Sequence, residues 1–143
     1  MNHDSYSDAY LRDILATART IAVVGASPRC HRPSHRVMAY LQRHGYRAIP
    51  VNPNAAGRTI NGEICHAALG DVLAPIDIVD VFRRSELAGE ALDAAIAIGA
   101  KAVWMQLGVR DDAAAARAEA HGLKVVMNRC PAIEIPRLQL PPR

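Results

Sequence analysis

Short apolar runs alternate along the chain with longer segments in which apolar residues recur at helical spacing. Runs of this length that stay apolar over successive positions are typical of strands buried on both faces of a sheet. We therefore predict five strands, at residues 20–24, 46–51, 76–82, 102–105 and 123–127.

The segments between these runs predict helices at residues 5–18, 34–44, 85–98 and 111–121. Ser5 and Asp8 have the spacing of a capping box, and Ser85 is the expected N-cap of the third helix. Residues 54–66 predict a loop with one short extended piece, and residues 67–73 predict a brief helix.

Strands that alternate with helices of this length are typical of βαβ units and a parallel sheet. We predict an α/β fold in three α/β/α layers, built on a doubly wound, five-stranded, mostly parallel Rossmann-like sheet. The expected strand order is 3-2-1-4-5, numbered along the chain. Residues 1–143 are expected to form one domain, and the tail at residues 131–143, with its four prolines, is expected to be irregular.

Composition and charge favour an anionic small molecule as the partner. The chain of 143 residues has a net charge of +3 and is 50% hydrophobic, as expected of a globular protein. Only 4% of the residues are aromatic and none interleave with an arginine stripe, which disfavours a nucleic-acid surface. No apolar run approaches the roughly 20 residues that span a bilayer, and residues 1–5 do not resemble a signal peptide. We expect a cytoplasmic protein; the oligomeric state stays open.

No metal site or catalytic residue is predicted. Cys30, Cys65 and Cys130 are scattered, without the spacing of a disulfide framework or a zinc site. Cys130 follows the last strand, but it lacks a recognised catalytic partner and is expected to be structural. His31 and His35 lie closest to the ligand edge of the sheet and are expected to be surface or supporting residues. No acid–base pair is evident.

The turn after the first strand has the features of a phosphate site. Gly25, Ala26 and Ser27 lead from this strand toward a helix, where free N–H groups and the positive end of the helix dipole favour an anion. Cations at such a position are unfavourable unless an anion lies between them. The cationic and hydroxyl side chains gathered there are Arg29, Arg32, Ser34 and Arg36.

The standard dinucleotide signature is absent. The turn is neither GxGxxG nor a P-loop. Asn52 and Pro53 follow the second strand, where NAD-binding sheets usually have an acidic residue for the ribose. This disfavours NAD and leaves NADP open.

Segments that follow the strands resemble those of the small, stand-alone bacterial CoA-binding proteins. They are Val23–Pro28, Arg32–Ser34, Pro50–Pro53, Val79–Arg84, Trp104–Gly108 and Asn128–Pro131. The resemblance extends from about Ile21 to Leu138. The chain is also similar to the CoA-binding domain of the succinyl-CoA synthetase α-subunit, whose Asn-Cys-Pro segment resembles Asn128–Pro131 with Arg129 inserted.

The resemblance implies a coenzyme A site over the carboxyl edge of the sheet. Gly25, Ala26 and Ser27 would face the pyrophosphate, and Arg32 and Ser34 would add phosphate contacts. The remaining implied contacts are Asn52 and Pro53 beside the adenosine, Val81, Phe82 and Arg83 on the adenine and ribose side, and Met105, Gln106 and Gly108 along the pantetheine.

These observations favour a module that binds CoA or an acyl-CoA without catalysis of its own. The alternative is an enzyme, either NADP-dependent or one chain of a two-chain acyl-CoA synthetase. The chain lacks the synthetase's additional domain and its phosphorylated histidine. A protein-interaction domain with a vestigial site is a third hypothesis, disfavoured by the intact turn at Gly25.

Overall fold

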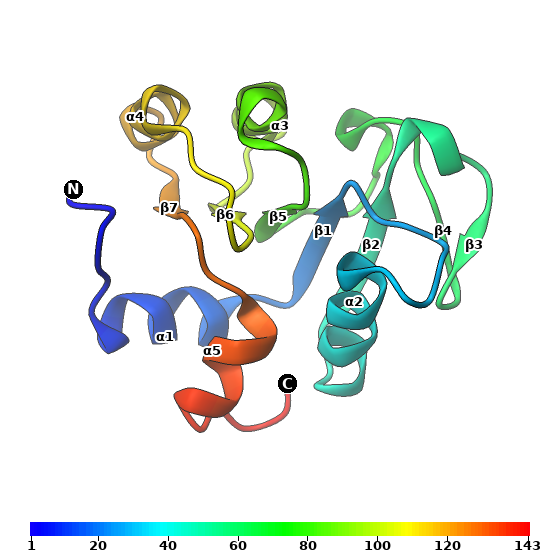
Figure 1. Ribbon diagram of the computed structural model, residues 1–143, viewed down its shortest axis with the longest axis horizontal. Coiled ribbons are helices and arrows are strands. Elements are labelled where there is room, and N and C mark those ends of the chain that lie inside the picture. Colours follow the sequence, from blue (N-terminus) through cyan, green and yellow to red (C-terminus); the bar gives the residue numbers. More distant parts are fainter.

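One parallel sheet forms the centre of the computed structural model, which describes residues 1–143 (Figure 1). Its strand order is β2-β1-β5-β6-β7, and every neighbouring pair is parallel. The strands are β1 (Thr20–Val24), β2 (Arg47–Val51), β5 (Ile78–Val81), β6 (Ala102–Met105) and β7 (Lys124–Val126). The predicted α/β, doubly wound fold is confirmed, with each strand close to its predicted position.

The predicted order of the strands is wrong. In the numbering of the five predicted strands the observed order is 2-1-3-4-5, because β5 pairs with β1 through Ile21 and Ile78 instead of lying outside β2. The outer edge of β2 is already in use, since His66 forms a parallel bridge with Val51. This is the flavodoxin-like arrangement, in which the order reverses between the first and third strands.

The segment between β2 and β5 lies along the outer edge of β2. It contains no long helix. Instead it forms short elements, which are the 3₁₀ turns η1 (Pro53–Ala55) and η2 (Leu69–Asp71) and the hairpin of β3 (Thr59–Ile60) and β4 (Glu63–Ile64). The chain therefore folds over the edge of β2 and returns to the middle of the sheet.

Helices cover both faces of the sheet (Figure 1). On one face lie α1 (Asp8–Thr17), α2 (Pro33–Arg43) and α5 (Pro131–Arg137), and on the other lie α3 (Ser85–Ala97) and α4 (Asp112–Ala120). Trp104, fully buried under the first group, donates a hydrogen bond from Nε1 to the carbonyl of Arg129 at 2.9 Å. No helix is both long and apolar enough to cross a membrane.

Two predictions about local structure need correction. The tail is irregular only at residues 138–143, because residues 131–137 form α5. Pro131 occupies the first turn of this helix, where its missing N–H costs nothing, and Ile135 and Leu138 are buried against the core. The first helix begins at Asp8, with Ser7 rather than Ser5 as its N-cap; the Ser7 hydroxyl accepts a hydrogen bond from the N–H of Tyr10 at 3.1 Å.

Candidate functional site

The ends of β1 and β5 meet at the point where the strand order reverses, which is where open α/β sheets bind ligands. Gly25 follows β1 with a φ of +89°, a conformation that favours glycine. Its N–H donates to the carbonyl of Val51 at 2.8 Å, and the N–H of Phe82 donates to the carbonyl of Val24 at 2.8 Å. The turn after β1 is thus fixed from both neighbouring strands.

Side chains also hold this turn in place. Ser34 is buried, and its hydroxyl accepts a hydrogen bond from the N–H of Ser27 at 3.0 Å. Asn52 donates from its side-chain amide to the carbonyl of Ala26 at 2.8 Å and accepts from the N–H of Asn54 at 3.0 Å. Ser34 and Asn52, both predicted as ligand contacts, therefore position the backbone that a ligand would meet.

A cationic cavity of about 370 Å³ opens beside this turn. Helix α2 begins here at Pro33, with no acidic residue in its first turn and no side-chain cap. Arg29 and Arg32 are exposed at the cavity and form no ion pair. The cavity is lined by Gly25, Ser27, Arg29, Arg32, Pro33, Ser34 and Phe82. Unpaired guanidinium groups and the N-terminus of a helix together form an environment suited to a phosphate.

An apolar cavity of about 320 Å³ lies next to the cationic one. The two are adjacent because Val24 and Arg83 line the apolar cavity, whereas the neighbouring residues Gly25 and Phe82 line the cationic one. Its other lining residues are Val51, Pro53, Ala67, Ala68, Leu69, Leu87, Glu90, Ala91 and Ala94. A largely apolar lining beside a cationic cavity suits a flat base joined to a phosphate chain.

Sequence reasoning missed most of this apolar cavity. Leu87, Glu90, Ala91 and Ala94 lie on one face of α3, and Ala67 to Leu69 lead into η2. The helical spacing of the α3 residues was visible in the sequence. The position of α3 relative to β1 depends on the strand order, however. Without the correct strand order, these α3 residues could not be assigned to the site.

Several predicted residues are buried below the surface of this edge. The side chains of Val81 and Met105 are fully buried, and Ala26 is 1% exposed. They can offer a ligand only backbone atoms, so side-chain contacts from them are not expected. The backbone of Gly108 is held by a side chain, because its N–H donates to Oδ1 of Asn128 at 2.7 Å.

Asp80 is the least expected residue near the site. It is fully buried between its strand neighbours Val23 and Trp104, and it lies two residues before Phe82 at the edge, as Trp104 lies two residues before Gln106. Neither carboxyl oxygen has a hydrogen-bond partner, and the same holds for Oε1 of the buried Gln106. Burial raises the pKa of Asp80 well above its usual range. Burial therefore favours the neutral, protonated form of this carboxyl in the fold.

The candidate nucleophile and histidines have no catalytic arrangement. Cys130 is 6% exposed and is the N-cap residue of α5, without a side-chain hydrogen bond; its structural role stays a prediction. His35 is half-buried on α2, and the exposed His31 accepts a hydrogen bond at its carbonyl from Arg36 at 2.5 Å. No acid–base pair lines either cavity of this edge.

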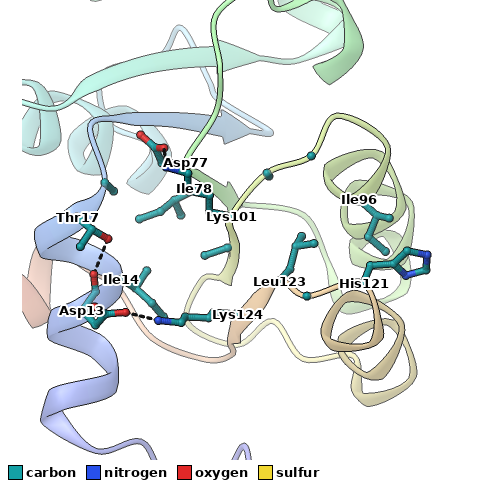
Figure 2. Close-up of a pocket in the computed structure, with 15 residues that line it drawn as sticks. Asp13, Ile14, Thr17, Asp77, Ile78, Ile96, Lys101, His121, Leu123 and Lys124 are labelled. Atoms are coloured by element: carbon teal, nitrogen blue, oxygen red, sulfur yellow. Dashed lines mark hydrogen bonds and ion pairs between the residues drawn. The ribbon is translucent and has the colours of Figure 1, made fainter.

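The largest cavity of the molecule lies elsewhere, at the opposite edge of the sheet (Figure 2). It measures about 500 Å³ and includes none of the residues predicted for the CoA site. Position relative to the strand ends, rather than size, identifies the candidate site, because the carboxyl edge is where ligands bind in this class of sheet.

Comparison with known proteins gives one family and several close structures. The family model for the CoA binding domain matches residues 19–136. The uncharacterized protein YneT of Bacillus subtilis is 36% identical over 124 residues, covering 87% of this chain and 90% of YneT.

Two solved structures are similar over nearly the whole chain. A Thermus thermophilus protein described as cell-free ID.343 superposes with a TM-score of 0.89 at 39% identity, covering 93% of this chain and 99% of the other. A hypothetical protein from Pyrococcus horikoshii OT3 superposes with a TM-score of 0.90 at 37% identity, covering 97% of this chain and 96% of the other. These matches show the same backbone arrangement over 93% and 97% of this chain.

Proposed function

The chain belongs to the CoA binding domain family, and from that premise we propose that it binds coenzyme A or an acyl-CoA at the carboxyl edge of its sheet. The observation that carries the proposal is the pair of adjacent cavities on either side of Gly25, one cationic and one apolar. Coenzyme A has the matching parts, a diphosphate next to an adenosine.

The diphosphate would lie against the turn at Gly25, Ala26 and Ser27 and the first turn of α2. Arg29 and Arg32 have no carboxylate partner of their own, so an incoming phosphate displaces no ion pair. Guanidinium groups and backbone N–H groups are the donors that proteins most often use for this anion.

The adenosine would enter the apolar cavity, between Pro53 and Leu69 on one side and α3 on the other. Arg83 is half-buried there and forms no ion pair, which suits a phosphate on the ribose. We propose that the pantetheine then follows the edge past Phe82, Gln106 and Gly108.

Binding without catalysis is part of the proposal. The buried Cys130 and the buried, unpartnered Asp80 offer no exposed nucleophile or base at this edge. Acyl-CoA synthesis from ATP needs a residue or metal site for phosphoryl transfer, and no such group lines the two cavities. We therefore expect no acyl-CoA formation by the purified chain with ATP and simple carboxylic acids.

Calorimetric titration with CoA, dephospho-CoA, acetyl-CoA, NADP and NAD tests the proposal. We expect CoA to bind with a Kd in the micromolar range, about −8 kcal/mol, and more tightly than NAD.

The variant Ser27→Asp should abolish CoA binding, because its carboxylate would repel the phosphates and occupy the N–H donors that would bind them. Thr59→Asp, a change at an exposed residue of β3 that lines neither cavity, is the matched control. Binding of NAD as tight as that of CoA would contradict the proposal.

A further inference from the structure

The cavity at the amino edge of the sheet has no role in the proposed CoA site. It lies where α1 ends, where β5, β6 and β7 begin, and where the chain leaves α3 and α4 (Figure 2). Ile14, Ile78 and Leu123 form its apolar floor. A volume of about 500 Å³ is within the range of small-molecule sites.

Both lysines of the protein line this cavity. The chain has 17 cationic side chains, and all except Lys101 and Lys124 are arginines. Lys124 begins β7 and Lys101 directly precedes the neighbouring strand β6, and the N–H of Lys124 donates to the carbonyl of Lys101 at 3.1 Å. A lysine combines a compact charge with a long apolar stem, so the pair gives this cavity cations at its rim without adding a polar floor.

The carboxylate nearest to Lys101 is already satisfied by the backbone. Oδ2 of Asp77 accepts hydrogen bonds from the N–H groups of Arg19 at 2.9 Å and Thr20 at 3.0 Å. The contact between Nζ of Lys101 and Oδ1 of Asp77 is longer, at 3.4 Å, and the Lys101 side chain is 79% exposed. The Lys101 ammonium is therefore available to another anion, and Asp77 would keep its structural bonds.

Lys124 has a partner that it can exchange. It pairs with Asp13 across the mouth of the cavity, but both side chains are about half-exposed (Figure 2). Ion pairs between exposed side chains contribute little to stability. His121 adds a third group at the rim: Nδ1 lies 2.9 Å from the carbonyl of Arg117, which leaves Nε2 open.

We propose that this cavity binds a small amphipathic carboxylate, with its apolar body on Ile14, Ile78 and Leu123 and its carboxylate on Lys101 and Lys124. The carbonyl ends of α3 and α4 face this edge and would favour a cation, but the two lysines already follow those helix ends. Of the two carboxylates that line the cavity, Asp77 is held by backbone N–H groups and Asp13 is paired with Lys124, so an amine would have only Asp13 to contact, after displacing Lys124. The balance of available groups thus favours an anion.

The proposed site is independent of CoA binding. Strand β5 separates the two, since Ile78 at its start faces this cavity and Phe82 just beyond its end faces the phosphate cavity. A molecule at the amino edge leaves the carboxyl edge open.

Titration with butyrate, hexanoate, hexylamine and hexanol, followed by methyl NMR of isoleucine, leucine and valine, tests the proposal. We expect hexanoate to bind more tightly than either hexylamine or hexanol. Each added methylene from butyrate to hexanoate should improve the affinity roughly fourfold if it is fully buried. Shifts should concentrate on the methyl groups of Ile14, Ile78 and Leu123, and Val24 and Leu69 at the other edge should not move.

Variants separate the role of charge from that of structure. Lys101→Gln should weaken hexanoate binding about fivefold or more, because it removes one ion contact, and should leave hexanol binding unchanged. Lys101→Arg keeps the charge and should retain most of the hexanoate affinity. Arg58→Gln removes the same charge from an exposed residue that does not line this cavity; it is the control and should have no effect. Equal binding of hexylamine, unchanged binding in Lys101→Gln, or shifts confined to the other edge would each overturn the proposal.

Discussion

A methyl group on Gly25 would lie 2.7 Å from the carbonyl oxygen of Phe82. The turn after β1 and the end of β5 are therefore in contact through backbone alone, at the point where the order of the strands reverses. The site proposed for the diphosphate depends on this close approach of the two backbone segments.

Gly25→Ala should destabilise the fold by about 2 kcal/mol, because it combines a positive φ with a steric clash against backbone. The displaced turn should also weaken CoA binding by about tenfold, or 1.4 kcal/mol. Urea unfolding and calorimetry measure the two effects. Gly57→Ala is the matched control, because Gly57 has a φ of +84° with no atom within 4 Å of the added group. It should cost about 1 kcal/mol from backbone strain and leave CoA affinity intact. Equal effects of the two changes would contradict the importance of the Gly25–Phe82 contact.

Asp80 should make the protein less stable as the pH rises. Its folded-state pKa is raised by burial, whereas in the unfolded chain it ionises in the usual range near pH 4. Between these two pKa values the folded state holds one more proton than the unfolded state. The contribution of Asp80 to the free energy of unfolding therefore falls by about 1.4 kcal/mol per pH unit, starting near pH 4.

Asp80→Asn removes this titration. At pH 4 the free energies of unfolding of the variant and the wild type should differ by about 1 kcal/mol or less, since a neutral carboxyl is replaced by an amide of similar shape. Above pH 4 the variant should become progressively more stable relative to the wild type. Urea unfolding across this pH range measures the difference. Glu86→Gln, whose carboxylate is 78% exposed, should run parallel to the wild type. A stability difference between Asp80→Asn and the wild type that does not change with pH would mean that Asp80 is ionised in the fold.

Asp77 should act in the opposite direction. Burial alone would raise its pKa, but the N–H groups of Arg19 and Thr20, together with Lys101, bring the pKa below its usual value. A carboxylate with a lowered pKa adds stability above its unfolded pKa, and this stability is lost as the pH falls through the folded pKa. Asp77→Asn should accordingly cost about 1–2 kcal/mol at pH 7, with the loss shrinking below about pH 4.

Acid titration of unfolding compares Asp77→Asn with Asp13→Asn. Asp13 lines the same cavity, but its ion pair is exposed, so this control should cost about 0.5 kcal/mol or less. A loss for Asp77→Asn that stays constant down to pH 2 would show that its hydrogen bonds do not depend on its charge.

The positions of the strands and the phosphate turn could be predicted because both depend on local features. Apolar runs such as Thr20–Val24 are buried on both faces, and Gly25 with its neighbouring arginines has a recognisable chemistry. The order of the strands depends on contacts between residues far apart in the sequence, such as Ile21 with Ile78. Periodicity within each segment contains no information about such pairing.

The remaining differences also have physical causes. The helix of the tail was missed because proline is read as a breaker, although Pro131 at the first turn is compatible with a helix. The burial of Asp80 could not be predicted from the sequence, because aspartate side chains are almost never fully buried without a partner. Glu90 and Leu87 could be placed on one helical face, but only the fold brings that face to the apolar cavity.

Thiol labelling of the native protein should distinguish its three cysteines. Cys30 is exposed and should react quickly, whereas Cys65 and Cys130 are buried and should react slowly. Burial raises the pKa of the Cys65 thiol, outweighing the hydrogen bond that it donates to the carbonyl of Asn52, and this slows its reaction further. Intact-mass and peptide analysis over time would follow each thiol.

Cys130→Ala should keep the CoA affinity within about threefold, because the Cys130 side chain packs in the core and does not face either ligand cavity. Cys130→Asp should destabilise the fold by about 2 kcal/mol or more, since a charge would be buried without a partner. Fast labelling of Cys130 that CoA prevents would instead place this thiol beside the bound ligand, and a disulfide or thioester with CoA would then become the better explanation of its position at the ligand edge.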